Sequence, residues 1–203
     1  MKKIFSCIVV TFMWWQASAQ LMVGAAVGTF NAYAAAEKFK PIGPTIKIEY
    51  ADSYSQSIYL DCSLYNKTQD AGTTTITDID GAYIGEAETT VKYSIKNLQL
   101  GFKRIMGKNL SEKGFSFFLG GGAALALVKS TYKYHLSGEN ISDSKYNQSI
   151  FGFHFNAGVQ YNFSILIVEL KGNFDIMLKP IAGGDSYLTS GTRLGVIIPL
   201  TKE

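Results

Sequence analysis

Ionisable side chains recur in this chain at a spacing of two residues, with an apolar residue between them. Lys47 and Glu49 flank an isoleucine, and Glu169 and Lys171 flank a leucine. Side chains two residues apart lie on the same face of a β-strand, so acids and bases from several strands could meet and form ion pairs. The candidate polar network comprises Lys47, Glu49, Asp61, Lys92, His154, Glu169, Lys171, Asp175 and Arg193.

Two other groups of residues have the composition of ligand sites without the spacing. Asp78 and Asp80 precede a glycine as in part of a calcium loop, but the third ligand of an EF-hand is missing. The glycine run 120–122 does not fit G-x-G-x-x-G, and no strand-to-helix pattern surrounds it. The sequence therefore predicts neither a metal site nor a cofactor, and we expect the acidic segment 66–88 to be a solvated loop.

Alternation of apolar and polar residues is the dominant pattern of the chain. In residues 150–163 every odd position from Phe151 onward is apolar, and the even positions from Gly152 are small or polar. Similar runs occur at 21–30, 45–51, 57–65, 89–102, 115–134, 165–178 and 192–200. Helical spacing is hard to find, so we predict an all-β fold of eight antiparallel strands. In the run 89–102 the phase shifts by one residue, which predicts a β-bulge near Lys96 and Asn97.

The charged residues indicate which face of the strands lies inside. A Lys or Arg on the lipid side of a membrane barrel costs about 2–4 kcal/mol at the bilayer midplane. We therefore expect a closed barrel with a charged, side-chain-filled interior and an apolar face toward lipid. Aromatic residues near the strand ends, Tyr65 and Tyr93 among them, are expected to form two girdles at the interfaces. A soluble periplasmic lipid-binding barrel has the opposite arrangement, and its outer face would be unusually poor in charge.

The first residues have the pattern of a secretory signal peptide. Lys2 and Lys3 precede an apolar run, and Ala-Ser-Ala at 17–19 is a cleavage signal, so the mature domain is expected to span 20–203. Without the two lysines the formal charge falls from +3 to +1, and export and this near-neutral charge both argue against nucleic-acid binding. Cys62 would be the single cysteine of the mature chain, so no internal disulfide is expected.

The connections between the expected strands alternate in length. The long ones are 33–43, 68–88, 135–148 and 179–189, and the shorter ones are 51–56, 106–114 and about 162–164. Short periplasmic turns and long external loops are typical of bacterial outer-membrane barrels. We therefore expect the protein in the outer membrane of a Gram-negative bacterium, as a monomer in contact with membrane lipid and lipopolysaccharide.

The whole mature chain resembles the small outer-membrane β-barrels of Bacteroidota and, more broadly, the eight-stranded barrels of the OmpA and OmpX type. The resemblance rests on the signal end, the opening strand LMVGAAVGTFNA and the run FGFHFNAGVQYNF. It implies a non-enzymatic protein with a structural, adhesive or surface-binding role, inserted by the barrel-assembly machinery. Such barrels usually end on an aromatic residue, whereas this chain ends Thr-Lys-Glu.

An enzyme that modifies lipid A, as an acyltransferase or a deacylase, is the alternative. Such chemistry needs a serine or a base near the outer leaflet, with a histidine and a carboxylate. His154, or His135 with Ser137, are the candidates. Glycine stands at 138, where the deacylases have asparagine, so we expect His154 to be a polar interior residue and His135 a rim residue, with no catalytic residue.

Overall fold

The computed structural model describes residues 20–32, 40–51, 55–77, 80–108, 110, 112–136, 142–181 and 187–200. The expected signal peptide at 1–19 lies outside these ranges. The strands are β1 (Gln20–Thr29), β2 (Asn31–Ala32), β3 (Ile42–Ala51), β4 (Gln56–Thr77), β5 (Tyr83–Gly107), β6 (Gly114–His135), β7 (Ser144–Asn162), β8 (Ile167–Met177) and β9 (Leu188–Pro199). Within the described ranges no helix is long and apolar enough to cross a membrane.

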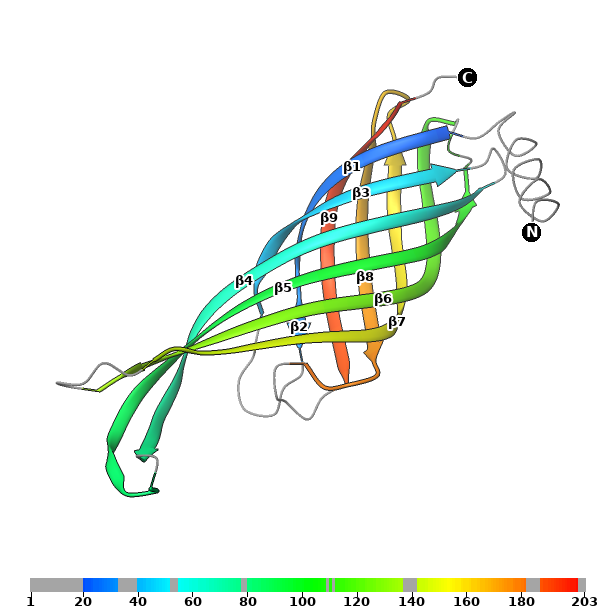
Figure 1. Cartoon of the computed structure of the whole chain (residues 1–203). Coiled ribbons are helices and arrows are strands. Elements are labelled where there is room, and N and C mark those ends of the chain that lie inside the picture. The colour runs from blue at the N-terminus through cyan, green and yellow to red at the C-terminus, as the bar shows by residue number, and fades with distance from the viewer. Residues whose placement is uncertain are drawn as a thin grey trace, which may run out of the picture.

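The strands form one closed antiparallel sheet (Figure 1). β1 pairs with β3 on one side and with β9 on the other, so Val23 lies opposite both Ile48 and Ile198. β2 also pairs with β9 and continues β1 beyond Phe30, so the two segments act as one strand. The ring therefore has eight strands, which confirms the predicted all-β fold, a closed, eight-stranded antiparallel up-and-down barrel.

Burial alternates along the strands, as the sequence pattern predicts. In β8 every second residue from Ile167 to Met177 is buried, and the residues between them are partly or fully exposed. In β7, His154 is completely buried, whereas Phe151 and Phe153 are 63% and 58% exposed. The phenylalanines of the run 150–163 therefore face outward, and the small and polar residues face the interior.

β5 keeps one phase of burial along its length, so the bulge predicted near Lys96 is wrong. Every second residue from Ala87 to Ile105 is buried, and β5 pairs residue for residue with β6 from Glu88 to Gly107. The apparent shift arises because the chemical character of the interior changes along the strand. Inward positions of β5 are apolar near its start and polar further on, while the direction of each side chain keeps alternating.

Two apolar clusters close the interior at opposite ends. Four strands extend beyond the barrel at one end, which we call the extended end, and short turns join the strands at the other, the turn end. The cluster toward the extended end comprises Phe30, Ala32, Tyr65, Val91, Tyr93, Ile95, Ala124, Ala126, Val128, Ile150, Met177 and Ile181. The cluster toward the turn end comprises Met22, Ala51, Ile105, Leu110, Phe118, Ile167 and Ile197. Tyr65 and Tyr93 are only 1% and 8% exposed, so their predicted place in an external girdle is wrong.

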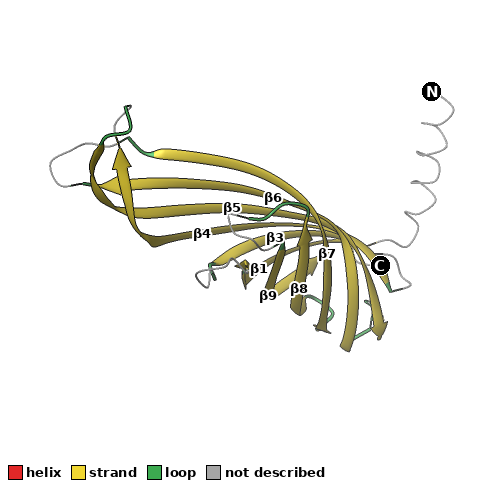
Figure 2. Ribbon diagram, turned by 90° about the horizontal axis from the view of Figure 1, so that it is seen from below, coloured by secondary structure: helices red, strands yellow, loops and turns green. Residues whose placement is uncertain are grey.

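The outer parts of β4 to β7 form an extended sheet, defined as Asn66–Thr77, Tyr83–Lys96, Lys129–His135 and Ser144–Ser149 (Figure 2). The ladder of β4 with β3 ends at Ser63, and the ladder of β7 with β8 starts at Gly152. The predicted loop 68–88 is thus largely a β-hairpin. Its threonine-rich composition suits strands as well as loops, and Thr89 Oγ1 donates a hydrogen bond across the hairpin to Thr74 Oγ1 at 2.9 Å.

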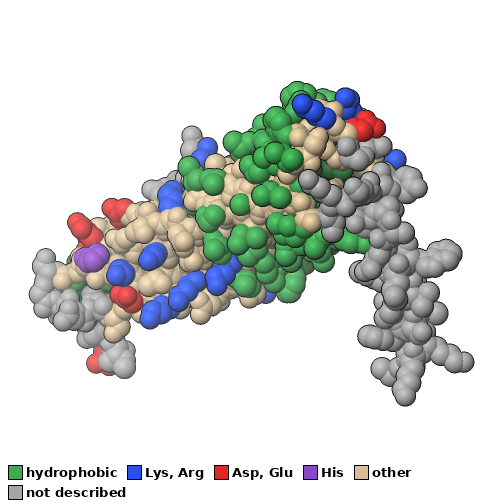
Figure 3. Space-filling model, turned by 90° about the horizontal axis from the view of Figure 1, so that it is seen from above, with side chains coloured by type: hydrophobic (Ala, Val, Ile, Leu, Met, Phe, Trp, Pro, Cys, Tyr) green, Lys and Arg blue, Asp and Glu red, His purple; other side chains and the backbone are tan. Residues whose placement is uncertain are grey.

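Exposed apolar side chains form a belt on the barrel between the turn end and the extended sheet, and Figure 3 shows one face of it. It consists of the outward residues of all eight strands, among them Val27, Ile46, Ile48, Leu60, Leu100, Phe102, Phe115, Phe117, Leu119, Phe151, Phe153, Phe155, Leu170, Phe174, Leu194, Val196 and Ile198. β8 is 11 residues long and β3 is 10 residues long. Roughly 9–11 tilted residues are what a strand needs to cross the hydrocarbon of a bilayer.

Candidate functional site

The structure brings most of the predicted polar network together inside the barrel. Every member except Lys92 is buried: Lys47, Glu49, Asp61, His154, Glu169, Lys171, Asp175 and Arg193. Lys92 is exposed on the outer surface of β5, so its predicted interior position is wrong. The prediction assumed that the apolar residues beside it face outward, as they do in the belt. At the level of Lys92 the interior itself is apolar, so there the apolar residues of β5 face inward and the polar residues face outward.

A first ion cluster lies toward the turn end and joins β3, β5 and β8. Lys47 Nζ is 2.7 Å from Glu169 Oε1 and 3.1 Å from Glu49 Oε2. Lys103 Nζ lies between the same two carboxylates, 2.6 Å from Glu49 Oε1 and 3.1 Å from Glu169 Oε2. Ser57 also donates to Glu49, at 2.6 Å. Two ammonium groups and two carboxylates therefore form a closed ring of ion pairs across the barrel.

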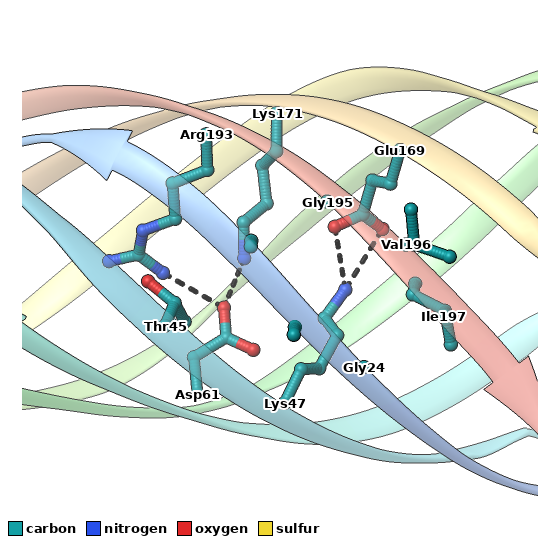
Figure 4. Close-up of a pocket in the computed structure, with 12 residues that line it drawn as sticks. Gly24, Thr45, Lys47, Asp61, Glu169, Lys171, Arg193, Gly195, Val196 and Ile197 are labelled. Carbon is teal, nitrogen blue, oxygen red and sulfur yellow. Dashed lines mark hydrogen bonds and ion pairs between the residues drawn. The ribbon is translucent and has the colours of Figure 1, made fainter.

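A second ion cluster lies toward the extended end. Asp61 on β4 accepts from Lys171 on β8, and from Arg193 Nη1 on β9 at 2.9 Å (Figure 4). Arg193 also donates to Gln99 Oε1 at 2.9 Å, and Gln99 donates to Asp175 at 2.8 Å. Further donors to Asp175 are Asn97 at 3.3 Å and Thr189 at 3.1 Å.

Tyr59 links the two clusters. Lys47 Nζ and Lys171 Nζ lie 5.4 Å and 5.0 Å from the centre of its ring, within cation–π range. Its hydroxyl accepts from Asn156 Nδ2 and lies 2.5 Å from His154 Nε2. His154 Nδ1 lies 3.0 Å from the carbonyl oxygen of residue 123, which can only accept. His154 therefore donates from Nδ1 and accepts a hydrogen bond from the Tyr59 hydroxyl at Nε2, so both ring nitrogens have partners.

Glycines on the inward face make room for this arrangement. A Cβ at Gly101 would lie 2.5 Å from Tyr59 Oη and 2.7 Å from His154 Nε2. A Cβ at Gly120 would lie 2.7 Å from Asn156 Oδ1. All three distances are well below van der Waals contact. The small residues thus allow long polar side chains from the opposite strands to meet at the centre of the barrel.

Sequence reasoning missed Lys103 and Gln99, which are buried and central to the network. The sequence analysis ended the run at residue 102, one residue before Lys103, and it collected only ionisable side chains, which left out Gln99. The signal that could have found them is the alternation itself: Leu98, Leu100 and Phe102 face outward, so residues 99 and 103 between and after them face inward. With Lys103 included, the buried charges among the described residues are four cations and four anions.

The cavity beside the ion clusters is too small for a substrate. A cavity of about 10 Å³ lies between Gly24, Gly195, Lys47, Asp61 and Lys171 (Figure 4). That volume corresponds to roughly one water molecule. Paired charges thus fill the described interior between the two apolar clusters.

The catalytic alternative gains no geometric support. His135 is exposed at the end of β6, Ser137 lies outside the described residues, and His154 is enclosed by its hydrogen bonds. Among the residues that the structure describes, no group of three or more His, Cys, Asp or Glu side chains could hold a metal ion.

Comparison with solved structures defines the class of fold. No family model matches the sequence, and no match was found among curated proteins. A major outer membrane protein from Thermus thermophilus matches with a TM-score of 0.60 and 11% identity, over 90% of this chain and 99% of that chain. Ail, the attachment invasion locus protein of Yersinia pestis, matches with a TM-score of 0.54 and 12% identity, over 90% of this chain and 97% of that chain.

Neisserial surface protein A also matches, with a TM-score of 0.53 and 16% identity, over 89% of this chain and 98% of that chain. These identities establish a shared fold and no more. The chain has the fold of the small outer-membrane β-barrels.

We predict that Asp61→Asn destabilises the barrel strongly. The change leaves Lys171 and Arg193 without their shared carboxylate, and an uncompensated buried charge costs about 3–5 kcal/mol. Unfolding in urea, from detergent micelles or vesicles, measures the free energy of unfolding. Asp61→Asn combined with Lys171→Met should recover part of the loss. A free energy of unfolding for Asp61→Asn within about 0.5 kcal/mol of the wild type would contradict this role.

We also predict that Gly101→Ala lowers the free energy of unfolding more than Gly172→Ala does. At Gly101 the new methyl group collides with Tyr59 and His154, and overpacking of this kind costs about 1–3 kcal/mol. At Gly172, which faces outward, the atom nearest to a new Cβ is a carbonyl oxygen at 3.8 Å, an ordinary contact. The same urea titration compares the two variants, and equal stability would rule out the proposed crowding at Gly101.

Proposed function

We propose that this protein is a non-enzymatic integral outer-membrane β-barrel that displays the extended sheet at the cell surface of a Gram-negative bacterium. The observation that carries the proposal is the opposite character of the two faces. The outward residues of the belt are apolar, and the buried charges of the same strands are paired inside. Lipid would contact the belt, and the barrel-assembly machinery would insert the chain.

The extended sheet supports a surface-binding or adhesive role over a purely structural one. From Asn66 to Thr77, β4 has no ladder with β3, and from Ser144 to Ser149, β7 has none with β8. Such sheet edges present backbone donors and acceptors to which an extended peptide can add. The segment Thr73–Thr77 is rich in β-branched residues, which favour pairing.

Impermeant thiol labelling of intact cells tests this orientation. In a Cys62→Ser background, Thr73→Cys on the extended sheet should react with a membrane-impermeant maleimide in intact cells. Lys113→Cys, at the turn end, should react only after lysis. Labelling of Lys113→Cys in intact cells, with Thr73→Cys protected, would contradict the proposed orientation.

The filled interior also predicts that the protein does not act as an open pore. Lys47, Lys103, Glu49 and Glu169 cross the barrel and pair with one another, and the apolar clusters lie on either side. We expect no steady single-channel current when the purified protein is added to a planar bilayer, with protein-free detergent as the control. A large, steady conductance would show that the interior opens to water.

A further inference from the structure

Four lysines surround Thr131 on the outward face of the extended sheet. Lys92 on β5 and Lys145 on β7 lie directly opposite Thr131 on the two neighbouring strands. Lys129 and Lys133 lie two residues before and after Thr131 on β6, and therefore on the same face. Directly opposed side chains have Cβ atoms about 4.5–5.5 Å apart, so the ammonium groups of this lysine quartet can converge above one hydroxyl.

The quartet has no internal compensation for its charge. None of its members forms an ion pair or a side-chain hydrogen bond with the residues that the structure describes. The residues directly opposite them in the ladders are Thr68, Thr90, Ser94, Asn147 and Thr131, all neutral and able to hydrogen-bond. Like charges on adjacent strands are destabilising, so an external anion would relieve their repulsion.

The charged residues around the quartet differ between its two sides. Asp70, Glu88 and Asp143 border it on the side away from the apolar belt, and Asp70 accepts a hydrogen bond from the backbone N–H of Gly72 at 2.9 Å. On the side toward the belt the next charged residue is a further cation, Lys96, which lies diagonally across from Lys129. The acidic neighbours of the quartet therefore lie on the side away from the belt.

The belt begins next to the quartet. Lys129 follows Leu127 by two residues, about 7 Å along the strand, and Lys96 lies directly opposite Leu127. Phe151, one row further into the belt, is 63% exposed. Figure 3 shows basic side chains on the extended sheet, next to the band of hydrophobic side chains. Groups bound here would belong to the headgroup layer above the outer leaflet.

We propose that the lysine quartet and Lys96 bind phosphate groups of lipopolysaccharide in the outer leaflet. This inference rests on the proposed membrane insertion of the belt. Each lysine supplies three N–H donors and a full charge, and Thr131 adds a hydroxyl donor. The lipid source follows from the adjacent belt, which holds the acyl chains of the same molecule against the barrel.

Binding of purified lipopolysaccharide to the protein in detergent micelles, measured by isothermal titration calorimetry, tests the proposal. Lys129→Gln with Lys133→Gln should bind about 25-fold more weakly than the wild type, since each lysine near an anionic membrane surface contributes roughly fivefold. Lys108→Gln with Lys113→Gln removes the same charge at the turn end and should bind as the wild type does. Enzymatically dephosphorylated lipopolysaccharide should bind both double variants and the wild type equally weakly.

Three results would overturn the proposal. They are unchanged affinity of the Lys129/Lys133 variant, full affinity for dephosphorylated lipopolysaccharide, and tighter binding of a soluble sulfated polysaccharide than of lipopolysaccharide. The change in gel migration on boiling, recorded for each preparation, distinguishes failure of the proposed barrel insertion from failure of the proposed phosphate binding. If the wild type shows no such change, both the barrel insertion and this inference fail. If it shows the change and the variant binds normally, this inference alone fails.

Discussion

The paired charges in the middle of the barrel constrain everything around them. Lys47, Lys103, Glu49 and Glu169 form one closed ring of ion pairs, and Asp61 holds Lys171 and Arg193 in a second cluster. Removing such groups from water costs several kcal/mol for each ion, and only good geometry with further hydrogen bonds offsets the cost. Ser57, Gln99, Asn97 and Thr189 supply those hydrogen bonds.

Several features of the fold follow from this requirement. The partners come from β3, β4, β5, β8 and β9, so the ion pairs form only when the sheet is closed and in register. Inward glycines such as Gly101 are needed because the side chains that meet at the centre are long. The apolar clusters at both ends keep water from competing for the ion pairs. Buried ion pairs are weak evidence for stability in themselves, and here their clear consequence is to fix which face is inside.

Much of this arrangement could be predicted from alternation. The runs containing Lys47, Glu169 and Lys171 have charged residues on one face and apolar residues on the other. Because lipid strongly disfavours charge, the charged side chains could be predicted to face the interior. Alternation separates two faces without saying which is inside, and that limit explains the errors. At Lys92 the barrel interior is apolar and the outer surface is polar, the reverse of the belt. Lys103 was missed because the run was ended at residue 102, one residue before it.

The length of the extended sheet could not be predicted for a different reason. Residues 68–88 contain Gly, Asp and several Thr, a composition shared by loops and exposed strands. Their structure comes from cross-strand pairing, in which Thr74 meets Ala87 and Gln69 meets Val91. Neither segment contains a local sequence signal that identifies its pairing partner on the other strand.

Cell fractionation combined with gel electrophoresis tests the central claim, that the apolar face of the barrel lies in lipid and the charges lie inside. The account predicts that the protein sediments with the outer membrane, needs detergent for extraction and migrates differently before and after boiling. Recovery in the soluble periplasmic fraction without detergent, with no change in migration on boiling, would contradict it.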